Sequence, residues 1–186
     1  IEDFLTQKGF MNETLTFGRV KNLWSVKRNK GPLLVFLGHV DVVPTGPENE
    51  WEHDPFSGYD DGTFINGRGT GDMKGGIACF MSALSRIDVD SLNYSIGFLI
   101  TADEEGPSKD GTVKVVEELL QRDEKIDFCL IGEPSTLETV GDNIRIGRRG
   151  SINIELEVLG KQGHAAYPAS CLLYTSDAAD ELLWGG

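Results

Sequence analysis

The sequence has few cysteines, no long apolar run and no leader-like start. Its 186 residues include three cysteines, too few for a disulfide framework. No segment has the roughly 18 to 20 apolar residues that a membrane-spanning helix needs. The opening stretch IEDFLTQKGF has no region typical of a signal peptide and indicates an amphipathic helix instead. We therefore expect a soluble protein of the cytoplasm, a reducing compartment, with no membrane contact.

Basic residues are also scarce. Lys and Arg number 17 against 30 Asp and Glu, which gives a formal net charge of -13. Broad contact with nucleic acid requires Lys and Arg to displace the counterions of phosphates, so the charge argues against a nucleic-acid partner. Many acidic proteins carry such charge as a solvated surface. The carboxylates are therefore informative only where they occupy unusual positions.

What the sequence does contain is enough apolar residues, 39%, to build a buried core. Short apolar runs bounded by Gly, Pro and Asp alternate with helical patterns, which is typical of an α/β fold. We expect a largely parallel mixed sheet flanked by helices. Cys79 and Cys129 lie in apolar runs and are predicted to be buried, inert thiols. The predicted strands are 33–38, 95–101 and 128–132, and the predicted helices are 75–87 and 112–122.

The pattern changes near the end of the chain. Residues 1–149 are expected to form the first domain, and the strict polar and apolar alternation of 151–158 predicts a strand with one wet face. We take 150–170 as the start of a second, α+β domain that is cut short. The last stretch, 171–186, reads CLLYTSDAADELLWGG and resembles a translated sequencing adaptor, so we expect it to be non-native. The alternative is a short natural helix over 177–184.

Acidic residues and one histidine follow the predicted strands. His39 and Asp41 follow the first strand, Glu104 and Glu105 the second, and Glu133 the third. Because ligand sites in open α/β sheets lie beyond the carboxyl ends of the strands, these side chains are expected to meet. Asp72, in the loop GRGTGDMKGG, adds a further acid.

So many carboxylates in one place would repel each other unless positive charge lay among them. One imidazole with several carboxylates and no Cys is typical of a catalytic zinc site, or of Mn or Co in the same cage. A shared carboxylate can hold two ions. Each residue also has a simpler explanation: a surface His, a solvated acidic loop, a helix cap at Asp72 or a Glu-Pro turn at Glu133. Their joint occurrence favours the metal.

Spacing adds two details. His39 and Asp41 are two residues apart on an extended segment, so both side chains point to one face and Asp41 can support the imidazole. Glu104 and Glu105 cannot both point the same way if their segment is extended. One is then expected to bind metal while the other faces the water to be deprotonated.

The motifs GHVDVVPTG, GRGTGDMKGG, TADEEG and GEP resemble those of the zinc aminoacylase and carboxypeptidase family of metallopeptidases, over roughly residues 33–169. Within that family, GTVKVVEELL, CLIGEPS, GRRGS and GKQGHAAYP look most like the succinyl-diaminopimelate desuccinylases. The resemblance implies that residues 1–149 are a catalytic zinc-hydrolase domain and that 150–170 begin a lid and dimerisation domain.

The resemblance also implies roles for individual residues. His39 and Glu133 would bind one zinc ion, Asp72 would bridge, and Glu105 would bind the second zinc ion. Glu104 would be the general base, with Asp41 as the supporting acid. Co²⁺ or Mn²⁺ could substitute for Zn²⁺.

Three further residues carry implied roles near the substrate. His164 would reach into the partner subunit's site of a homodimer and stabilise the oxyanion, while Tyr167 and Arg148 would approach the substrate. The alternatives are a domain-boundary hydrogen bond, core packing and a surface charge. The family's last metal ligand, a late His, has no counterpart in this sequence. We therefore expect an inactive fragment whose activity belongs to a full-length parent.

The activity implied is hydrolysis of N-succinyl-LL-2,6-diaminopimelate to succinate and LL-2,6-diaminopimelate, a step toward lysine. Two alternatives remain open. One is another deacylase of the same family, such as an acetylornithine deacetylase or an aminoacylase. The other is a non-catalytic relative that only binds a metal or peptide.

Overall fold

The computed structural model describes residues 1–147. Nearly all of them belong to one compact unit, Ile1–Ile144, and a second unit begins at Arg145. Within the described part of the chain, no helix has the length and apolarity needed to cross a membrane. The predicted strand over 151–158 and the predicted non-native tail lie outside the described residues.

A five-stranded sheet forms the centre of the unit, in the order β1-β2-β6-β3-β7. β3 (Leu33–His39) pairs in parallel with both β6 (Ser95–Thr101) and β7 (Phe128–Ile131). β2 (Val20–Lys27) runs antiparallel to β6 and to β1 (Met11–Phe17). The predicted α/β fold with a largely parallel mixed sheet is confirmed.

The β1–β2 hairpin is the part of the sheet that the sequence pattern did not predict. In β1 only Leu15 is buried, so the strand has no continuous apolar run to mark it. The strands are joined by a two-residue turn, because Phe17 pairs with Val20. Gly18 has a φ of +55° in this turn, a conformation that glycine adopts without a steric cost. A glycine between two alternating segments was therefore the available signal.

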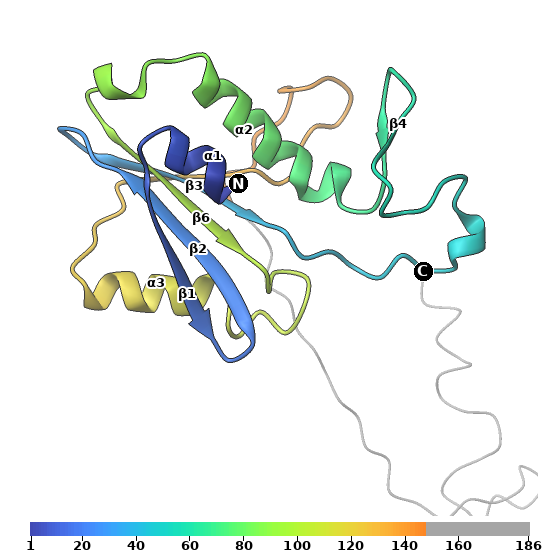
Figure 1. Cartoon of the computed structure of the whole chain (residues 1–186), viewed down its shortest axis with the longest axis horizontal. Helices are drawn as coiled ribbons and strands as arrows, with labels where there is room; N and C mark the ends of the chain where they lie inside the picture. Colours follow the sequence, from blue (N-terminus) through green and yellow to red (C-terminus); the bar gives the residue numbers. More distant parts are fainter. Residues whose placement is uncertain (148–186) are drawn as a thin grey trace, which may run out of the picture. The chain divides into compact units, whose positions relative to one another are not determined.

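Helices cover both faces of the sheet (Figure 1). α1 (Glu2–Gln7) and α2 (Gly75–Ser85) pack on one face, where Leu5 and Ile77 share a core with Phe98. α3 (Thr112–Gln121) packs on the other face through Val115 and Leu119. Every residue of β6 is buried, as expected for a strand between two apolar layers.

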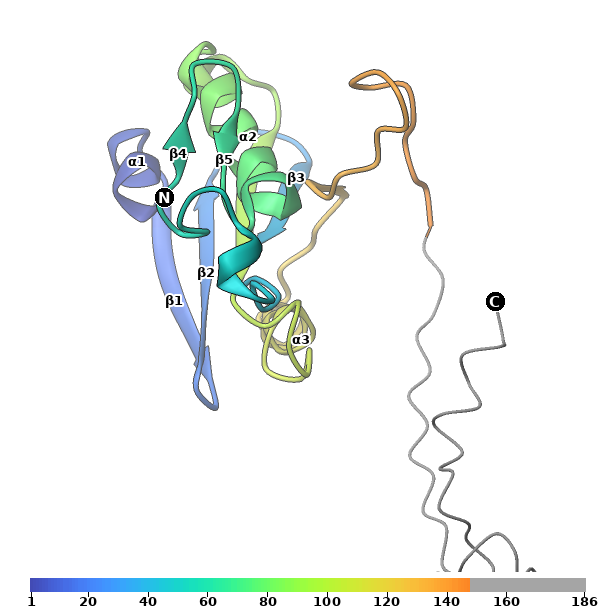
Figure 2. The same cartoon turned by 90° about the vertical axis from the view of Figure 1, so that its right-hand side faces the viewer.

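Shorter elements connect these layers. β4 (Tyr59–Asp60) and β5 (Ile65–Asn66) form a separate two-stranded hairpin. Figure 2 draws this hairpin in front of α2, and Figure 1 shows it beyond the N-terminal end of that helix. Short helical turns occupy Glu48–Glu50 (η1), Thr70–Lys74 (η2) and Val89–Ser91 (η3). Of these, η2 leads directly into α2 and carries Asp72.

The prediction that Cys79 and Cys129 are buried was wrong, because both are exposed. Cys79 lies on the outward side of α2. Cys129 lies in β7, where all four residues are exposed. An apolar run therefore did not guarantee burial here, because β7 is the last strand of the sheet that residues 1–147 form.

Candidate metal centre

The carboxyl ends of three parallel strands meet at one edge of the sheet. His39 is the last residue of β3 and pairs with Thr101, the last residue of β6. β7 ends at Ile131, opposite Leu37 of β3. The segments that follow these strands therefore bring His39, Glu104 and Glu133 together, as the sequence predicted.

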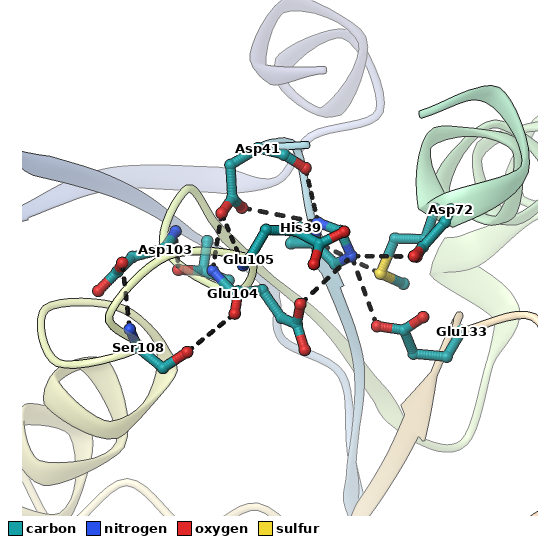
Figure 3. A network of polar contacts seen from close by, with 10 residues as sticks. His39, Asp41, Asp72, Asp103, Glu104, Glu105, Ser108 and Glu133 are labelled. Carbon is teal, nitrogen blue, oxygen red and sulfur yellow. Dashed lines mark hydrogen bonds and ion pairs between the residues drawn. The ribbon is translucent and has the colours of Figure 1, made fainter. Parts of the chain in front are cut away.

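His39 is the centre of this group (Figure 3). Its side chain is 1% exposed. Nδ1 lies 2.9 Å from the backbone carbonyl oxygen of Asp41, and a carbonyl only accepts, so Nδ1 carries the donated proton. Nε2 faces carboxylate oxygens of Asp72 at 3.3 Å, Glu133 at 3.4 Å and Glu104 at 4.0 Å.

Two overlapping sets of side chains have ligand atoms that lie within 4.8 Å of one another. Each set contains His39 and two acids: Asp72 with Glu133 in one, and Glu104 with Glu105 in the other. Because Nδ1 donates its proton to the Asp41 carbonyl, the Nε2 lone pair and the carboxylate oxygens are all acceptors. Such a group needs a cation or shared protons, and the mixture of one imidazole with carboxylates suits a divalent ion.

The electrostatics of this group show the same need for positive charge. Burial raises the pKa of Glu133, and the adjacent Asp72 raises it further. Burial likewise raises the pKa of Glu105, with Asp72 and Glu104 adding repulsion. For His39 burial alone lowers the pKa, but the Asp41 carbonyl and the surrounding carboxylates outweigh it, so the pKa is raised. A divalent cation between these acids would relieve their mutual repulsion.

Asp41 connects the histidine to the acidic loop. Its Oδ2 accepts backbone N–H groups from both Glu104 and Glu105, each at 2.9 Å. Its Oδ1 lies 3.6 Å from His39 Nδ1, so the direct contact to the imidazole comes from the Asp41 backbone carbonyl. Because both amides turn toward one oxygen, the segment is not extended, and the carboxylates of Glu104 and Glu105 both belong to the set around His39.

Asp103 is a buried acid whose role the sequence pattern did not reveal. It is 7% exposed, and its carboxylate accepts N–H groups from Ser108 at 3.2 Å, Lys109 at 2.9 Å and Asp110 at 2.9 Å. These hydrogen bonds close the loop that follows β6 and hold the backbone just before Glu104. An Asp two residues after the end of a fully buried strand was the only signal for this role.

Asp72 reaches the group from a glycine-rich loop. Its backbone is extended (φ -115°, ψ 102°) within η2, so the chain changes direction at this residue. The alternative that Asp72 caps α2 does not hold, because the N-cap position is Lys74 and no side chain caps the helix. The next residue, Met73, is 1% exposed and places its sulfur 3.2 Å from the His39 backbone nitrogen.

Two glycines allow the Asp72 and Glu133 segments to approach. A Cβ added to Gly76 would collide with the backbone carbonyl oxygen of Gly132. A Cβ added to Gly132 would lie 2.5 Å from the Phe36 ring and 2.9 Å from Met73. The start of α2 and the end of β7 are therefore in backbone contact, immediately beside the two acids that face His39.

The remaining residues with predicted roles, Arg148, His164 and Tyr167, lie outside the described residues. The structure thus brings together six of the nine predicted site residues: His39, Asp41, Asp72, Glu104, Glu105 and Glu133.

Comparison with known proteins shows the family of the chain. Residues 35–185 match the model of the peptidase family M20/M25/M40. The chain belongs to this family. In this chain the group around His39 lies at the carboxyl ends of β3, β6 and β7.

The chain is similar to curated succinyl-diaminopimelate desuccinylases, as the motifs indicated. It is 54% identical to the one from Marinobacter nauticus over 166 residues, which is 88% of this chain and 44% of that protein. It is 53% identical to the one from Hydrogenovibrio crunogenus over 171 residues, 90% of this chain and 45% of that protein. The chain therefore spans less than half the length of these relatives.

Solved structures confirm the fold alone. An M20 family metallo-carboxypeptidase from Sulfolobus solfataricus matches 72% of this chain and 31% of its own with a TM-score of 0.63 at 23% identity. Human carnosine dipeptidase 1 matches 72% of this chain and 31% of its own with a TM-score of 0.64 at 22% identity.

Proposed function

We propose that this chain is part of a longer metal-dependent amide hydrolase that converts N-succinyl-LL-2,6-diaminopimelate and water to succinate and LL-2,6-diaminopimelate. The observation that carries the proposal is the convergence of three carboxylates on Nε2 of a buried His39. The similarity to succinyl-diaminopimelate desuccinylases supports this choice of substrate.

The proposal includes two zinc ions, with Co²⁺ or Mn²⁺ as substitutes. His39 and Glu133 would hold one ion, Asp72 would bridge, and Glu105 would hold the other. When bound, such ions polarise the amide carbonyl and lower the pKa of a coordinated water toward neutrality. The chemistry of the group supports this assignment, since Nε2 of His39 and the carboxylate oxygens around it are all acceptors.

Glu104 is the general base in this proposal. Its carboxylate takes a proton from the attacking water and returns it to the leaving amine. The side chain is 47% exposed, so it is open to water, while its backbone is held by the Asp41 carboxylate. This combination of a fixed backbone and an open carboxylate supports the role, because proton transfer requires a correctly placed group.

Other parts of the proposal rest on the family resemblance. They are a homodimeric parent in the cytoplasm, with His164 as an oxyanion donor to the partner subunit's site. Arg148 and Tyr167 would contact the substrate, and a late His of the parent would complete the second metal site. The fragment by itself is expected to be inactive.

Substrate assays on the full-length parent test the activity. We expect zinc-dependent release of succinate from N-succinyl-LL-2,6-diaminopimelate, with little turnover of N-acetylornithine. The reverse preference would assign the chain to another deacylase of the family. Zinc binding without turnover of either amide would instead identify a binding protein.

A further inference from the structure

Arg68 joins two loops of the metal centre without being one of its ligands. One loop, Val42–Gly46, follows the His39–Asp41 segment, and the other, Gly67–Asp72, ends in an acid of the metal group. Both loops line a hollow of about 220 Å³ whose walls include Val42, Arg68, Asp72 and Glu105. Nothing in the family motifs assigned a role to this arginine.

The guanidinium of Arg68 is held by an aromatic ring and a carbonyl. Its Cζ lies 5.2 Å from the centre of the Trp51 ring. Its Nη2 is 3.4 Å from the backbone oxygen of Thr45, and the indole N–H of Trp51 donates to the same oxygen at 3.0 Å. The backbone N–H of Arg68 donates to Pro55 at 2.8 Å. The side chain is therefore fixed on the loop that follows the histidine.

The two loops also touch at Gly69, the residue after Arg68. Gly69 has a φ of +83°, and an added Cβ would lie 2.5 Å from Val42 and 3.4 Å from the carbonyl oxygen of Asp72. The loop that carries Asp72 thus rests directly on the residue that follows Asp41. A displacement of Arg68 would move Asp72 relative to His39.

Electrostatics explain why an arginine suits this place. Among residues 1–147 no carboxylate forms an ion pair with Arg68, and its buried Nε has no hydrogen-bond partner there. The guanidinium therefore has no acid partner among these residues, and Arg68 lines the same hollow as Asp72 and Glu105. A planar guanidinium can stack on Trp51 and donate to Thr45 simultaneously, which a lysine cannot reproduce.

We infer that Arg68 is a positioning residue that sets the distance between His39 and Asp72 and so determines metal affinity. The inference rests on the metal site of the proposed function. Supporting groups of this kind typically change metal affinity by 10- to 100-fold when they are removed. All the ligand side chains would still be present after such a change, but their spacing would differ.

The test is calorimetric zinc titration of the full-length parent and its Arg68→Gln variant. Arg86→Gln is the matched control, because Arg86 is an arginine at the C-terminal end of α2 that contacts Ser82 and no member of the metal group. We expect Arg68→Gln to weaken zinc binding about 10- to 100-fold and Arg86→Gln to leave it unchanged. Cobalt spectra should show an altered ligand geometry in Arg68→Gln alone.

Two milder variants keep the inference testable if Arg68→Gln does not fold. Arg68→Lys should give an intermediate zinc affinity, because it keeps the charge and loses the planar fork. Trp51→Phe keeps a ring under the guanidinium and loses the N–H bond to Thr45, so it should weaken zinc binding by several-fold.

The outcomes separate the inference from the proposed function. Zinc affinities of the Arg68 and Trp51 variants equal to that of the wild type overturn the inference, even if their melting temperatures fall, because a merely structural role predicts that result. A wild-type parent that does not bind zinc overturns the metal site itself, and the inference with it. A parent that binds zinc in an Arg68-dependent way but hydrolyses no succinylated substrate overturns only the proposed activity.

Discussion

The carboxylate of Asp41 accepts the backbone N–H of Glu104 at 2.9 Å, and the same oxygen accepts the N–H of Glu105 at 2.9 Å. One residue thus holds the segment that carries two acids, while its own carbonyl oxygen fixes the Nδ1 of His39. The β3 and β6 loops are coupled through Asp41, so the geometry around His39 depends on a side chain that does not itself face Nε2.

Replacing Asp41 by Ala should therefore weaken metal binding without removing a ligand. The two amides lose their acceptor, which costs about 1–3 kcal/mol where they are buried, and the Glu104–Glu105 segment gains freedom. We expect a 10- to 100-fold loss of zinc affinity by calorimetry, together with faster hydrogen exchange at these two amides. Asp54→Ala is the control, because Asp54 accepts the Phe56 N–H at 2.7 Å in a loop outside the metal group. Equal effects of the two variants would contradict the coupling.

The contact between Gly76 and Gly132 gives a steric prediction. A methyl group at Gly76 would meet the Gly132 carbonyl oxygen, so Gly76→Ala must separate the start of α2 from the end of β7. We expect a loss of about 1–3 kcal/mol in the free energy of unfolding and weaker zinc binding, because Asp72 and Glu133 move apart. Gly71→Ala is a strict control, since no atom lies within 4 Å of its added Cβ. Urea unfolding and zinc titration would measure both effects.

The sequence predicted most of the sheet because buried strands leave a local signal. The runs at β3, β6 and β7 are apolar and end in turn residues, and the acids after them mark the sheet edge. The α/β class and the joining of His39, Asp72 and Glu133 follow from these local signals together with the rule for strand ends.

The features that the sequence did not predict depend on contacts between distant segments. β1 has one buried residue and is recognisable only by its pairing with β2. The turn at Glu104 and Glu105 forms because Asp41, more than 60 positions away, supplies an acceptor. Cys129 lies in an apolar run, but whether it is buried depends on what packs against β7. No local pattern encodes such relationships.

Metal removal should destabilise the fold. A ligand that binds the native state at a concentration of 100 times its Kd raises the free energy of unfolding by about 2.7 kcal/mol. We therefore expect zinc to raise the melting temperature and a chelator to reverse the change. His39→Ala should abolish the zinc-dependent shift. His53→Ala should preserve it, because His53 packs against Tyr59, with ring centres 3.7 Å apart, and is in neither ligand set. A zinc shift that persists in His39→Ala would argue against the site.

The Glu13–Arg122 pair predicts a small pH dependence of stability away from the metal centre. Two bonds from Arg122, at 2.6 and 2.9 Å, lower the pKa of Glu13 below its ordinary value of 4.5. Because the folded-state pKa is depressed, the stabilisation is present above pH 4.5 and is lost as the pH falls through the lower folded value. Both side chains are at least 40% exposed, so the contribution should stay below about 1 kcal/mol.

Urea unfolding at pH 7 and pH 3 tests this pair. Glu13→Gln should be less stable than the wild type at pH 7, and the difference should shrink at pH 3. Glu52→Gln, which changes an exposed carboxylate that has no ion pair among residues 1–147, should match the wild type at both values. A Glu13→Gln deficit that is equally large at pH 3 would exclude ionisation of Glu13 as its cause.

Glu104 and Glu105 are adjacent and belong to the same set around His39, yet they are expected to differ in role. Burial and neighbouring acids raise the pKa of Glu105, which is expected of a group that a cation normally neutralises. The Glu104 side chain, in contrast, is 47% exposed and open to water.

In the full-length parent, Glu104→Gln should lower kcat by about 10²- to 10⁴-fold and retain zinc. Glu105→Gln should lose zinc affinity. Because the two changes are chemically identical and one position apart, zinc content and single-turnover rates measured on both variants separate the proton carrier from the ligand. Full turnover by Glu104→Gln, or zinc loss from it alone, would reverse the assignment.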